Sequence, residues 1–559
     1  MRCTAGKRLL AYAELSSATS ATPNWGCESL AFPEGRSLGC TIRREGEPLP
    51  HPARSRLPHQ GDDERDIGLD AHRNHGWLPT NIAGQLMSNA LRLADRHVEP
   101  TLLVHQRPSR ITLAMRTMTI GFGLVLLVSG CGGSGGSGGG GDSDMDTISR
   151  VDRQRNGSGG IGTANAIRLG YDGRWAVFTS NAGDLVADDP TGLQDVFLKD
   201  RSTGQLRLIS RAWNAIGRPV GNGTSSSPAL STEGEFVAFA SEAGNLVADD
   251  DNGVSDIFVV DVLASTIERV SVNSDGTEAN GASTACDLSQ EGRYIVFQSA
   301  ATNLVAGDSN ASIDVFRHDR STGITIRVST TSDGDQKTGD STAPSMNGAG
   351  YLVAFSSMAA LVDGDVNTTA TDVFVRDMTA STTTLASPQG AGTTHGADRP
   401  SGEACMAGDG AFLVYSSTRL DLIQFQDTAQ GSSVFRYNVN SGELEIVSRA
   451  ASGGPFITAN AFAPRISGDG SLVVFHSADS RLVENDYGQQ DVFLCEVDAQ
   501  VTTRLSVNEH ATPNNGPSGS ADISRDGSTV GFLATGSVLP GGSDQQHAYA
   551  MPVVPTGGG

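Results

Sequence analysis

The pattern of hydrophobic and polar positions repeats along most of the chain. Each repeat contains a short apolar run around one aromatic residue, such as GRYIVFQS at 292–299. Seven of these runs align, and their aromatic residues are Phe178, Phe239, Phe297, Phe355, Tyr415, Phe475 and Phe532. Successive aromatic residues are separated by 61, 58, 58, 60, 60 and 57 positions. Self-similarity of this kind is the sequence signature of a repeat architecture.

Each repeat is predicted to form four short strands. The first strand, such as STACDLS at 283–289, is followed in six repeats by Asp-Gly or Glu-Gly, which suits a tight turn with positive φ. The second strand is the aromatic run. A long acidic loop leads to the third strand, such as DIFVVD at 256–261, and a turn precedes the fourth, such as IERVSV at 267–272. Short Val- and Phe-rich runs are typical of sheets covered on both faces.

Repeated four-stranded sheets predict an all-β fold, a seven-bladed β-propeller of four-stranded antiparallel blades over residues 146–559. One blade cannot bury both of its faces, whereas blades stacked in a ring cover one another and protect their edges. The seventh copy ends after its third strand, HAYAMPV at 547–553, while DTISRVD at 146–152 resembles an isolated fourth strand. We therefore predict that this N-terminal strand, at 147–151, completes the last blade beside Ala548.

An export signal is predicted before the propeller. The stretch MRTMTIGFGLVLLVSGC at 115–131 combines a basic start, a short apolar run and small residues before Cys131. It resembles a bacterial lipobox, which implies a lipoprotein signal peptide at 115–130, lipidation of Cys131 and a Gly/Ser tether at 131–145. A buried strand followed by a loop is the alternative interpretation.

The position of this signal affects the interpretation of residues 1–114. A signal peptide ordinarily begins the chain, and residues 1–114 show no sustained strand or helix periodicity. We expect them to be a mis-called start or a disordered extension, with a genuine N-terminal domain as the alternative. Because Gly132 rather than aspartate follows Cys131, analogy with lipoproteins favours the outer membrane as the location within the bacterial cell envelope.

Charge and cysteine content narrow the classes of function. The net charge is −23, from 63 acidic and 40 basic residues, and such a surface repels nucleic acid. An acidic surface also serves simply to keep a protein soluble. The chain has seven cysteines and no CxxC motif. Cys286, Cys405 and Cys495 stand alone among apolar or small residues and are predicted to be buried free thiols.

No catalytic residue and no cofactor are assigned from motifs. The stretch GGSGG at 132–136 matches G-x-S-x-G, but it lies in the tether and not on a strand–turn–helix elbow. The repeat region contains five histidines, which occupy non-equivalent positions, and packing or solvent exposure is the plainer role for them than ligand binding. They are His318, His395, His476, His510 and His547.

The acidic loop NLVADDDNGVSDIFVVD at 245–261 suggests a calcium site at Asp250, Asn252 and Asp256. It fails the EF-hand test, because placing Gly253 at loop position six puts Val259 where a glutamate is required. Aspartates at the equivalent positions recur in other copies, where their side chains can close turns by bonding backbone amides. Turn formation is the leading interpretation and Ca²⁺ binding the alternative. The recurring residues are Asp189, Asp195, Asp308, Asp314, Asp365, Asp372, Asp486 and Asp491.

The DG-x-x-V-x-F-x-S, DVFVRD and RVSV runs resemble the TolB-like, WD40-like propeller repeats of bacterial envelope proteins, over residues 146–553. The resemblance implies the propeller fold and an envelope location. TolB itself binds a peptidoglycan-associated lipoprotein. This chain has longer blades, its own lipobox-like segment and no recognisable globular domain before the propeller. That partner is therefore not carried over to it.

We expect a lipid-anchored, non-enzymatic module that binds an envelope protein or a glycan on one face or in the central channel. The first alternative is a propeller-type lyase or hydrolase that acts on polysaccharide or cell-wall material. The second is a surface propeller stabilised by calcium.

Overall fold

The computed structural model describes the chain in two compact units, residues 1–139 and 140–559. The described residues are 99–107, 110–118, 148–154, 160–189, 191–363, 365, 370–388, 400–419, 422, 431–451, 459–484, 486, 488–508, 512–536, 538 and 543–554. Within these ranges every regular element is a β-strand, and no helix has the length and apolarity needed to cross a membrane.

The first unit contains one antiparallel hairpin. Strand β1 (Glu99–Arg107) pairs with β2 (Arg110–Met118) from Glu99↔Met118 to Arg107↔Arg110. No strand periodicity indicated this hairpin, and β2 overlaps the start of the expected signal peptide. The status of residues 1–114 stays a prediction. Cys131, most of the signal peptide and the tether lie outside the described residues.

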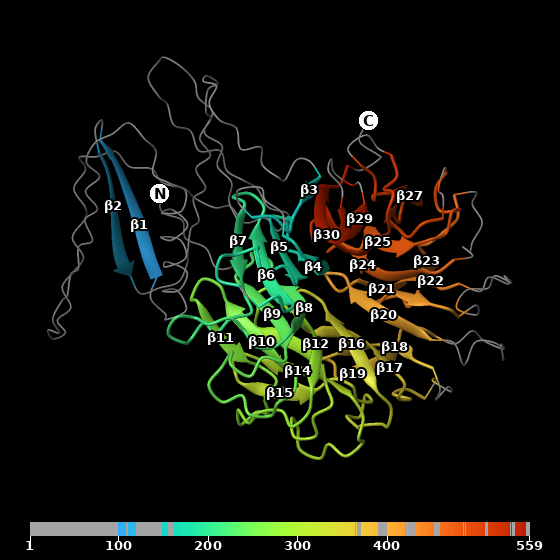
Figure 1. Ribbon diagram of the computed structural model, residues 1–559. Helices are drawn as coiled ribbons and strands as arrows, with labels where there is room; N and C mark the ends of the chain where they lie inside the picture. Colours follow the sequence, from blue (N-terminus) through green and yellow to red (C-terminus); the bar gives the residue numbers. More distant parts are fainter. Residues whose placement is uncertain are drawn as a thin grey trace, which may run out of the picture. The chain divides into compact units, whose positions relative to one another are not determined.

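The second unit consists of seven four-stranded antiparallel sheets arranged as blades in a ring (Figure 1). The first strands of blades 1 to 7 lie innermost and contact one another. They are β4 (Ala164–Leu169), β8 (Ser225–Leu230), β12 (Ser283–Leu288), β16 (Ser341–Met346), β20 (Ser401–Met406), β24 (Ala461–Ile466) and β28 (Ser518–Ile523). The second strands are β5 (Trp175–Ser180), β9 (Phe236–Ser241), β13 (Tyr294–Ser299), β17 (Leu352–Ser357), β21 (Phe412–Ser417), β25 (Leu472–Ser477) and β29 (Thr529–Gly536).

The outer half of each blade follows in the same order. The third strands are β6 (Asp195–Asp200), β10 (Asp256–Asp261), β14 (Asp314–Asp319), β18 (Asp372–Asp377), β22 (Ser433–Asn438), β26 (Asp491–Glu496) and β30 (Ser543–Pro552). The fourth strands are β7 (Gln205–Leu208), β11 (Thr266–Arg269), β15 (Ile324–Arg327), β19 (Thr382–Leu385), β23 (Leu444–Ile446), β27 (Val501–Arg504) and β3 (Ser149–Arg150). The predicted seven-bladed β-propeller is confirmed.

The two ends of the propeller meet in blade 7, as predicted. Strand β3 pairs with β30 through Ser149↔Ala550 and Arg150↔Tyr549, and the Val151 amide donates to the Ala548 carbonyl at 2.7 Å. Val151 is buried in one hydrophobic cluster with side chains of blades 1 and 7. The N-terminal strand therefore supplies both the missing strand and part of the core between the first and last blades.

Neighbouring blades bury apolar side chains against each other. The aligned aromatic residues of the second strands are fully buried, and each lies beside an aromatic residue of the third strand. Ring centroids in these pairs are 5.5–5.9 Å apart, as between Phe178 and Phe197 or Phe355 and Phe374. The hydrophobic clusters span two blades each, so stacking supplies the burial that one blade lacks.

A closed series of backbone hydrogen bonds runs around the propeller at the turns between first and second strands. One bond crosses each blade interface, and the series returns from blade 7 to blade 1. The bonds are Tyr171 N to Thr232 O, Thr232 N to Gln290 O, Gln290 N to Gly348 O, Gly348 N to Gly408 O, Asp409 N to Gly468 O, Gly468 N to Arg525 O and Asp526 N to Tyr171 O.

Candidate functional site

The connections between strands divide the propeller into two unequal faces. Because the strands of a blade alternate in direction, the first and third connections emerge on one face, and the second connection and the link to the next blade on the other. In blade 1 the former are 170–174 and 201–204, and the latter are 181–194 and 209–224. We call these the turn face and the loop face. Long loops on a rigid scaffold are where binding residues gather, and the predicted acidic residues lie on the loop face.

The third-strand aspartates are buried and bonded to a serine that follows the fourth strand. In five blades the serine hydroxyl donates to the carboxylate, at 2.5–2.7 Å in four of them. The same hydroxyl oxygen accepts a hydrogen bond from the backbone amide of the residue after the aspartate, as Ser329 does from Val315 at 3.1 Å. The pairs are Asp195–Ser210, Asp256–Ser271, Asp314–Ser329, Asp372–Ser387 and Asp491–Ser506. This arrangement ties the third strand to the fourth at the loop face.

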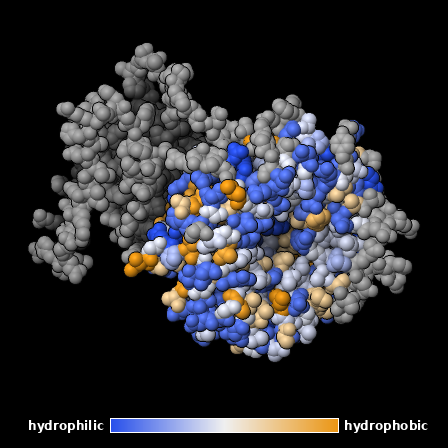
Figure 2. All heavy atoms as spheres, in the orientation of Figure 1, coloured by the Kyte–Doolittle hydropathy of each residue, from blue (hydrophilic) through white to orange (hydrophobic). Residues whose placement is uncertain are grey.

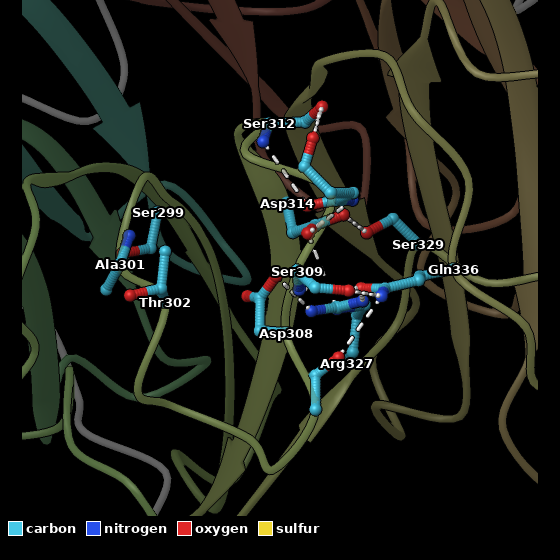
Figure 3. Close-up of polar contacts among 12 residues, drawn as sticks. Ser299, Ala301, Thr302, Asp308, Ser309, Ser312, Asp314, Arg327, Ser329 and Gln336 are labelled. Atoms are coloured by element: carbon cyan, nitrogen blue, oxygen red, sulfur yellow. Dashed lines mark hydrogen bonds and ion pairs between the residues drawn. The ribbon is translucent and has the colours of Figure 1, made fainter.

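An arginine lies between the loop aspartate and the strand aspartate in three blades. Figure 3 shows blade 3, where Arg327 at the end of β15 reaches back to the acidic loop. Its Nη2 lies 2.7 Å from Asp308 Oδ1 and its Nε lies 3.4 Å from Asp314 Oδ2. Arg269 lies 3.5 and 3.9 Å from Asp250 and Asp256, and Arg504 lies 3.4 and 3.6 Å from Asp486 and Asp491. The guanidinium supplies the positive charge that two buried carboxylates need.

The predicted calcium residues of blade 2 come together, but Arg269 lies among them. Oxygens of Asp250, Asp256 and Glu278 lie within 4.8 Å of one another, and Arg269 contacts all three carboxylates. Burial and the charge of Asp256 raise the pKa of Asp250 to about 6, against the opposing charge of Arg269.

The third predicted ligand, Asn252, is engaged in local hydrogen bonds. Its amide nitrogen donates to Asp256 Oδ2 at 2.7 Å, and its oxygen accepts the Val254 amide at 2.9 Å. The second contact is the predicted turn-forming role. Calcium binding at Asp250, Asn252 and Asp256 stays a prediction, and an ion there would have to share the cluster with a guanidinium.

These arginines were not predicted from the sequence. Each stands two residues before the bonded serine, in the fourth strand, so aligning fourth strands by themselves would have shown Arg in copies 2, 3 and 6 and Leu in copies 1 and 4. In blade 4 the charge comes from the next blade, where Arg419, fully buried, lies 3.1 Å from Asp372. That contact has no signal in the fourth-strand pattern.

Blade 7 carries a different buried pair at this position. His547 takes the place of the third-strand aspartate, because it pairs with Ala534 as the aspartates of other blades pair with the last serine of the second strand. Asp152 takes the place of the serine, because it follows β3 as the serines follow the other fourth strands. His547 Nδ1 lies 2.8 Å from Asp152 Oδ2, and Arg150 Nε donates to Asp152 Oδ1 at 2.8 Å. The side chains thus join the N-terminal strand to the C-terminal one.

The remaining predicted residues have packing roles. Cys286, Cys405 and Cys495 are free, as predicted; Cys495 is buried and the other two are half-buried. Burial raises the pKa of the Cys495 thiol to about 11, which leaves little thiolate at neutral pH. His318 contacts Thr325 Oγ1 at 2.9 Å and His476 packs edge-on against Phe462. His395 and His510 lie outside the described residues.

The exterior of the propeller is mostly polar on the side that Figure 2 shows. The face shown in Figure 2 is predominantly hydrophilic, with hydrophobic residues scattered among polar ones. Exposed large hydrophobic residues such as Ile216, Leu263 and Ile324 come from different strands and connections. Single exposed apolar residues of this kind are ordinary on a soluble domain.

No known family model matches the chain, and no curated protein matches it. Solved structures that resemble it include a TolB from Agrobacterium tumefaciens, at 14% identity and a TM-score of 0.32, covering 63% of this chain and 95% of that one. U3-55K is similar at 10% identity and a TM-score of 0.40, covering 73% of this chain and 98% of that one.

A third similar structure comes from an analysis of two prolyl endopeptidases, at 11% identity and a TM-score of 0.43. It aligns with 73% of this chain, and the chain spans about half, 51%, of that protein. At these identities the likeness concerns the fold alone. The predicted resemblance to TolB-like and WD40-like propellers is confirmed at that level, and the lipoprotein form stays a prediction.

Proposed function

We propose that this protein is a lipid-anchored propeller of the bacterial cell envelope that binds a protein or glycan partner on its loop face without catalysing a reaction. The observation that carries the proposal is the closed ring with its long connections gathered on one side. Seven blades hold the strand ends that flank these loops at set positions, which lowers the entropy lost when a partner binds.

The anchor is supported by the order of segments along the chain. An apolar run with a small-residue end precedes Cys131, a Gly/Ser stretch follows, and the first propeller strand begins at Ser149. By composition the stretch 131–145 is a tether, and a coil of that length spans roughly 20 Å. Such a spacing would hold the propeller close to the membrane while leaving one face accessible.

The proposal of a non-enzymatic role is supported by the state of the described histidines. His318, His476 and His547 make packing or structural contacts, and burial lowers the pKa of His318 and of His476. A general base works best with a pKa near the operating pH, and it must reach solvent or substrate. His318 and His476, which are buried and have a lowered pKa, do not meet that requirement.

The anchor is tested by intact mass spectrometry and fractionation of the protein from its native membrane. We expect the extracted protein to begin at Cys131 and to carry acyl chains. Cys131→Ser is expected to move the protein from the membrane to the soluble fraction, and Cys405→Ser, in the propeller, is expected to leave it in place. An unprocessed wild-type mass in the soluble fraction would refute the anchor.

The binding face is tested by photo-crosslinking in cells. A crosslinking side chain replaces Asp251, exposed on the loop face, and the control replaces Tyr171, half-exposed on the turn face. Adducts with protein or glycan are expected from the loop-face position. Adducts from the turn-face position alone would contradict the assignment, and depolymerisation of cell-wall polysaccharide by the purified protein would favour the enzymatic alternative.

A further inference from the structure

Blade 1 repeats the buried acidic pair of the loop face without its arginine. Asp189 and Asp195 are 1% and 0% exposed, and Asp195 bonds Ser210 as in the other blades. The fourth-strand position that holds Arg269, Arg327 or Arg504 elsewhere is Leu208. Among the described residues, the two carboxylates therefore lack the arginine that accompanies the same pair in blades 2, 3 and 6.

The next blade does not supply the charge either. In blade 4 the positive charge comes from Arg419 of blade 5, whose backbone amide donates to the serine that ends the second strand of blade 5. The equivalent residue of blade 2, which lies beside blade 1, is Ala243, and it carries no charge. Arg211, which follows the fourth strand of blade 1, pairs with the exposed Asp188.

One oxygen of this pair has no protein partner among the described residues. Asp189 Oδ1 accepts the Thr191 amide at 3.2 Å and the Thr191 hydroxyl at 2.9 Å, whereas its buried Oδ2 accepts no hydrogen bond. The Thr191 hydroxyl oxygen also lies 3.4 Å from Asp195 Oδ2. A buried carboxylate oxygen without a partner costs free energy, so something outside the chain is expected to satisfy it.

The electrostatics of the pair point the same way. Burial raises the pKa of Asp195 to about 6, with the charge of Asp189 adding to the shift and the Ser210 hydroxyl opposing it. A cation bound beside Asp195 would offset the negative charge that burial disfavours there.

We propose that Asp189, Asp195 and Thr191 bind a divalent cation, calcium, in the position that the arginine guanidinium takes in blades 2, 3 and 6. Carboxylate and hydroxyl oxygens are ligands that a hard cation prefers, and calcium tolerates irregular sets completed by water. Thr191 and Gly192 are exposed, so solvent can complete the shell from the loop face. The inference does not depend on the proposed envelope function.

The test is calorimetric titration of calcium chloride into the chelator-treated full chain, with magnesium chloride as a second arm. We expect calcium to bind and to raise the thermal midpoint. Leu208→Arg copies the arginine of blade 3 into blade 1 and is expected to abolish both effects while the protein stays folded. Asp189→Asn is expected to weaken binding by more than about tenfold.

Two further variants make the result specific. Arg327→Leu removes the guanidinium from blade 3 and is expected to create an additional calcium site there. Asp250→Asn tests the calcium site predicted in blade 2 and is expected to leave the blade 1 site unchanged. The proposal is overturned if wild type shows no calcium binding, if Leu208→Arg binds calcium like wild type, or if Asp250→Asn abolishes the signal.

Discussion

At the scale of single residues, polar groups buried in the blades follow one pattern with local exchanges of partner. Third-strand aspartates bond a serine hydroxyl, loop aspartates face an arginine, and His547 with Asp152 replaces the aspartate–serine pair in blade 7. The exchange in blade 7 keeps its buried groups paired, which matters because burial of an unpaired polar group costs about 1–3 kcal/mol, whereas the exchange of arginine for Leu208 in blade 1 leaves Asp189 Oδ2 without a partner among the described residues. His476 is an exception, since its buried Nδ1 has no partner among the described residues.

His476 is expected to make stability depend on pH. Burial lowers its pKa to about 4, against an ordinary value of 6.5, so the unfolded chain takes up a proton there before the folded protein does. The free energy of unfolding therefore decreases by up to about 3 kcal/mol as the pH falls from about 6.5 to about 4.

The variant His476→Gln removes that titration. Glutamine is the residue at the equivalent position of β13, Gln298, so the substitution suits the site. Urea unfolding at pH 7 and pH 4 should show a smaller loss of stability in the variant than in wild type. Parallel losses in the two proteins would mean that His476 is not held neutral by burial.

At the scale of strands and turns, the turns between the first and second strands join neighbouring blades as well as neighbouring strands. The glycine of each of these turns has a positive φ, and a Cβ on it would lie within 3 Å of the first residue of the second strand in the preceding blade. Gly292 meets Phe236, Gly350 meets Tyr294, and Gly173 of blade 1 meets Thr529 of blade 7. The turn glycine is therefore needed for both backbone conformation and blade packing.

Two glycines allow the cost of a positive φ to be measured separately from the cost of a clash with the preceding blade. Gly292 has φ +69 and a Cβ there would lie 2.3 Å from the Phe236 ring, whereas Gly276 has φ +81 and nothing within 4 Å. Both alanine variants are expected to lose about 1 kcal/mol from the positive φ. Gly292→Ala is expected to lose a further ~1–3 kcal/mol by overpacking, measured by chemical denaturation. Equal losses would show that the turn does not pack against the preceding blade.

The sequence carries the strands and turns because these depend on local periodicity. The aromatic runs and the turns repeat at aligned positions, and the N-terminal strand resembles the fourth strand that the seventh copy lacks. The fold follows from these features. The side-chain partners do not follow, because the third-strand aspartate and its arginine are 13 residues apart in blades 2, 3 and 6, while Arg419 reaches Asp372 from another blade. The hairpin of β1 and β2 lacks the repeat and was not predicted for the same reason.

At the scale of the whole molecule, the ring depends on one short strand. The first and last blades are joined by the same type of backbone hydrogen bond as the other blades, from the Asp526 amide to the Tyr171 carbonyl. Blade 7 differs because its fourth strand, β3, comes from the N-terminal side of the propeller. Ser149 and Arg150 pair with β30, and Asp152 bonds His547. Because the N-terminal strand pairs with the last blade, neither end of the propeller can unfold without breaking that pairing. This favours cooperative unfolding over fraying from the termini.

Hydrogen–deuterium exchange of the full chain, followed by mass spectrometry, tests this closure most directly. The peptide that covers 148–152 is compared with the peptide that covers β7, the fourth strand of blade 1. We predict that the 148–152 amides, including Val151, exchange as slowly as those of β7. Exchange of 148–152 at the rate of an unstructured peptide, while β7 stays protected, would show that the N-terminal strand does not close the propeller.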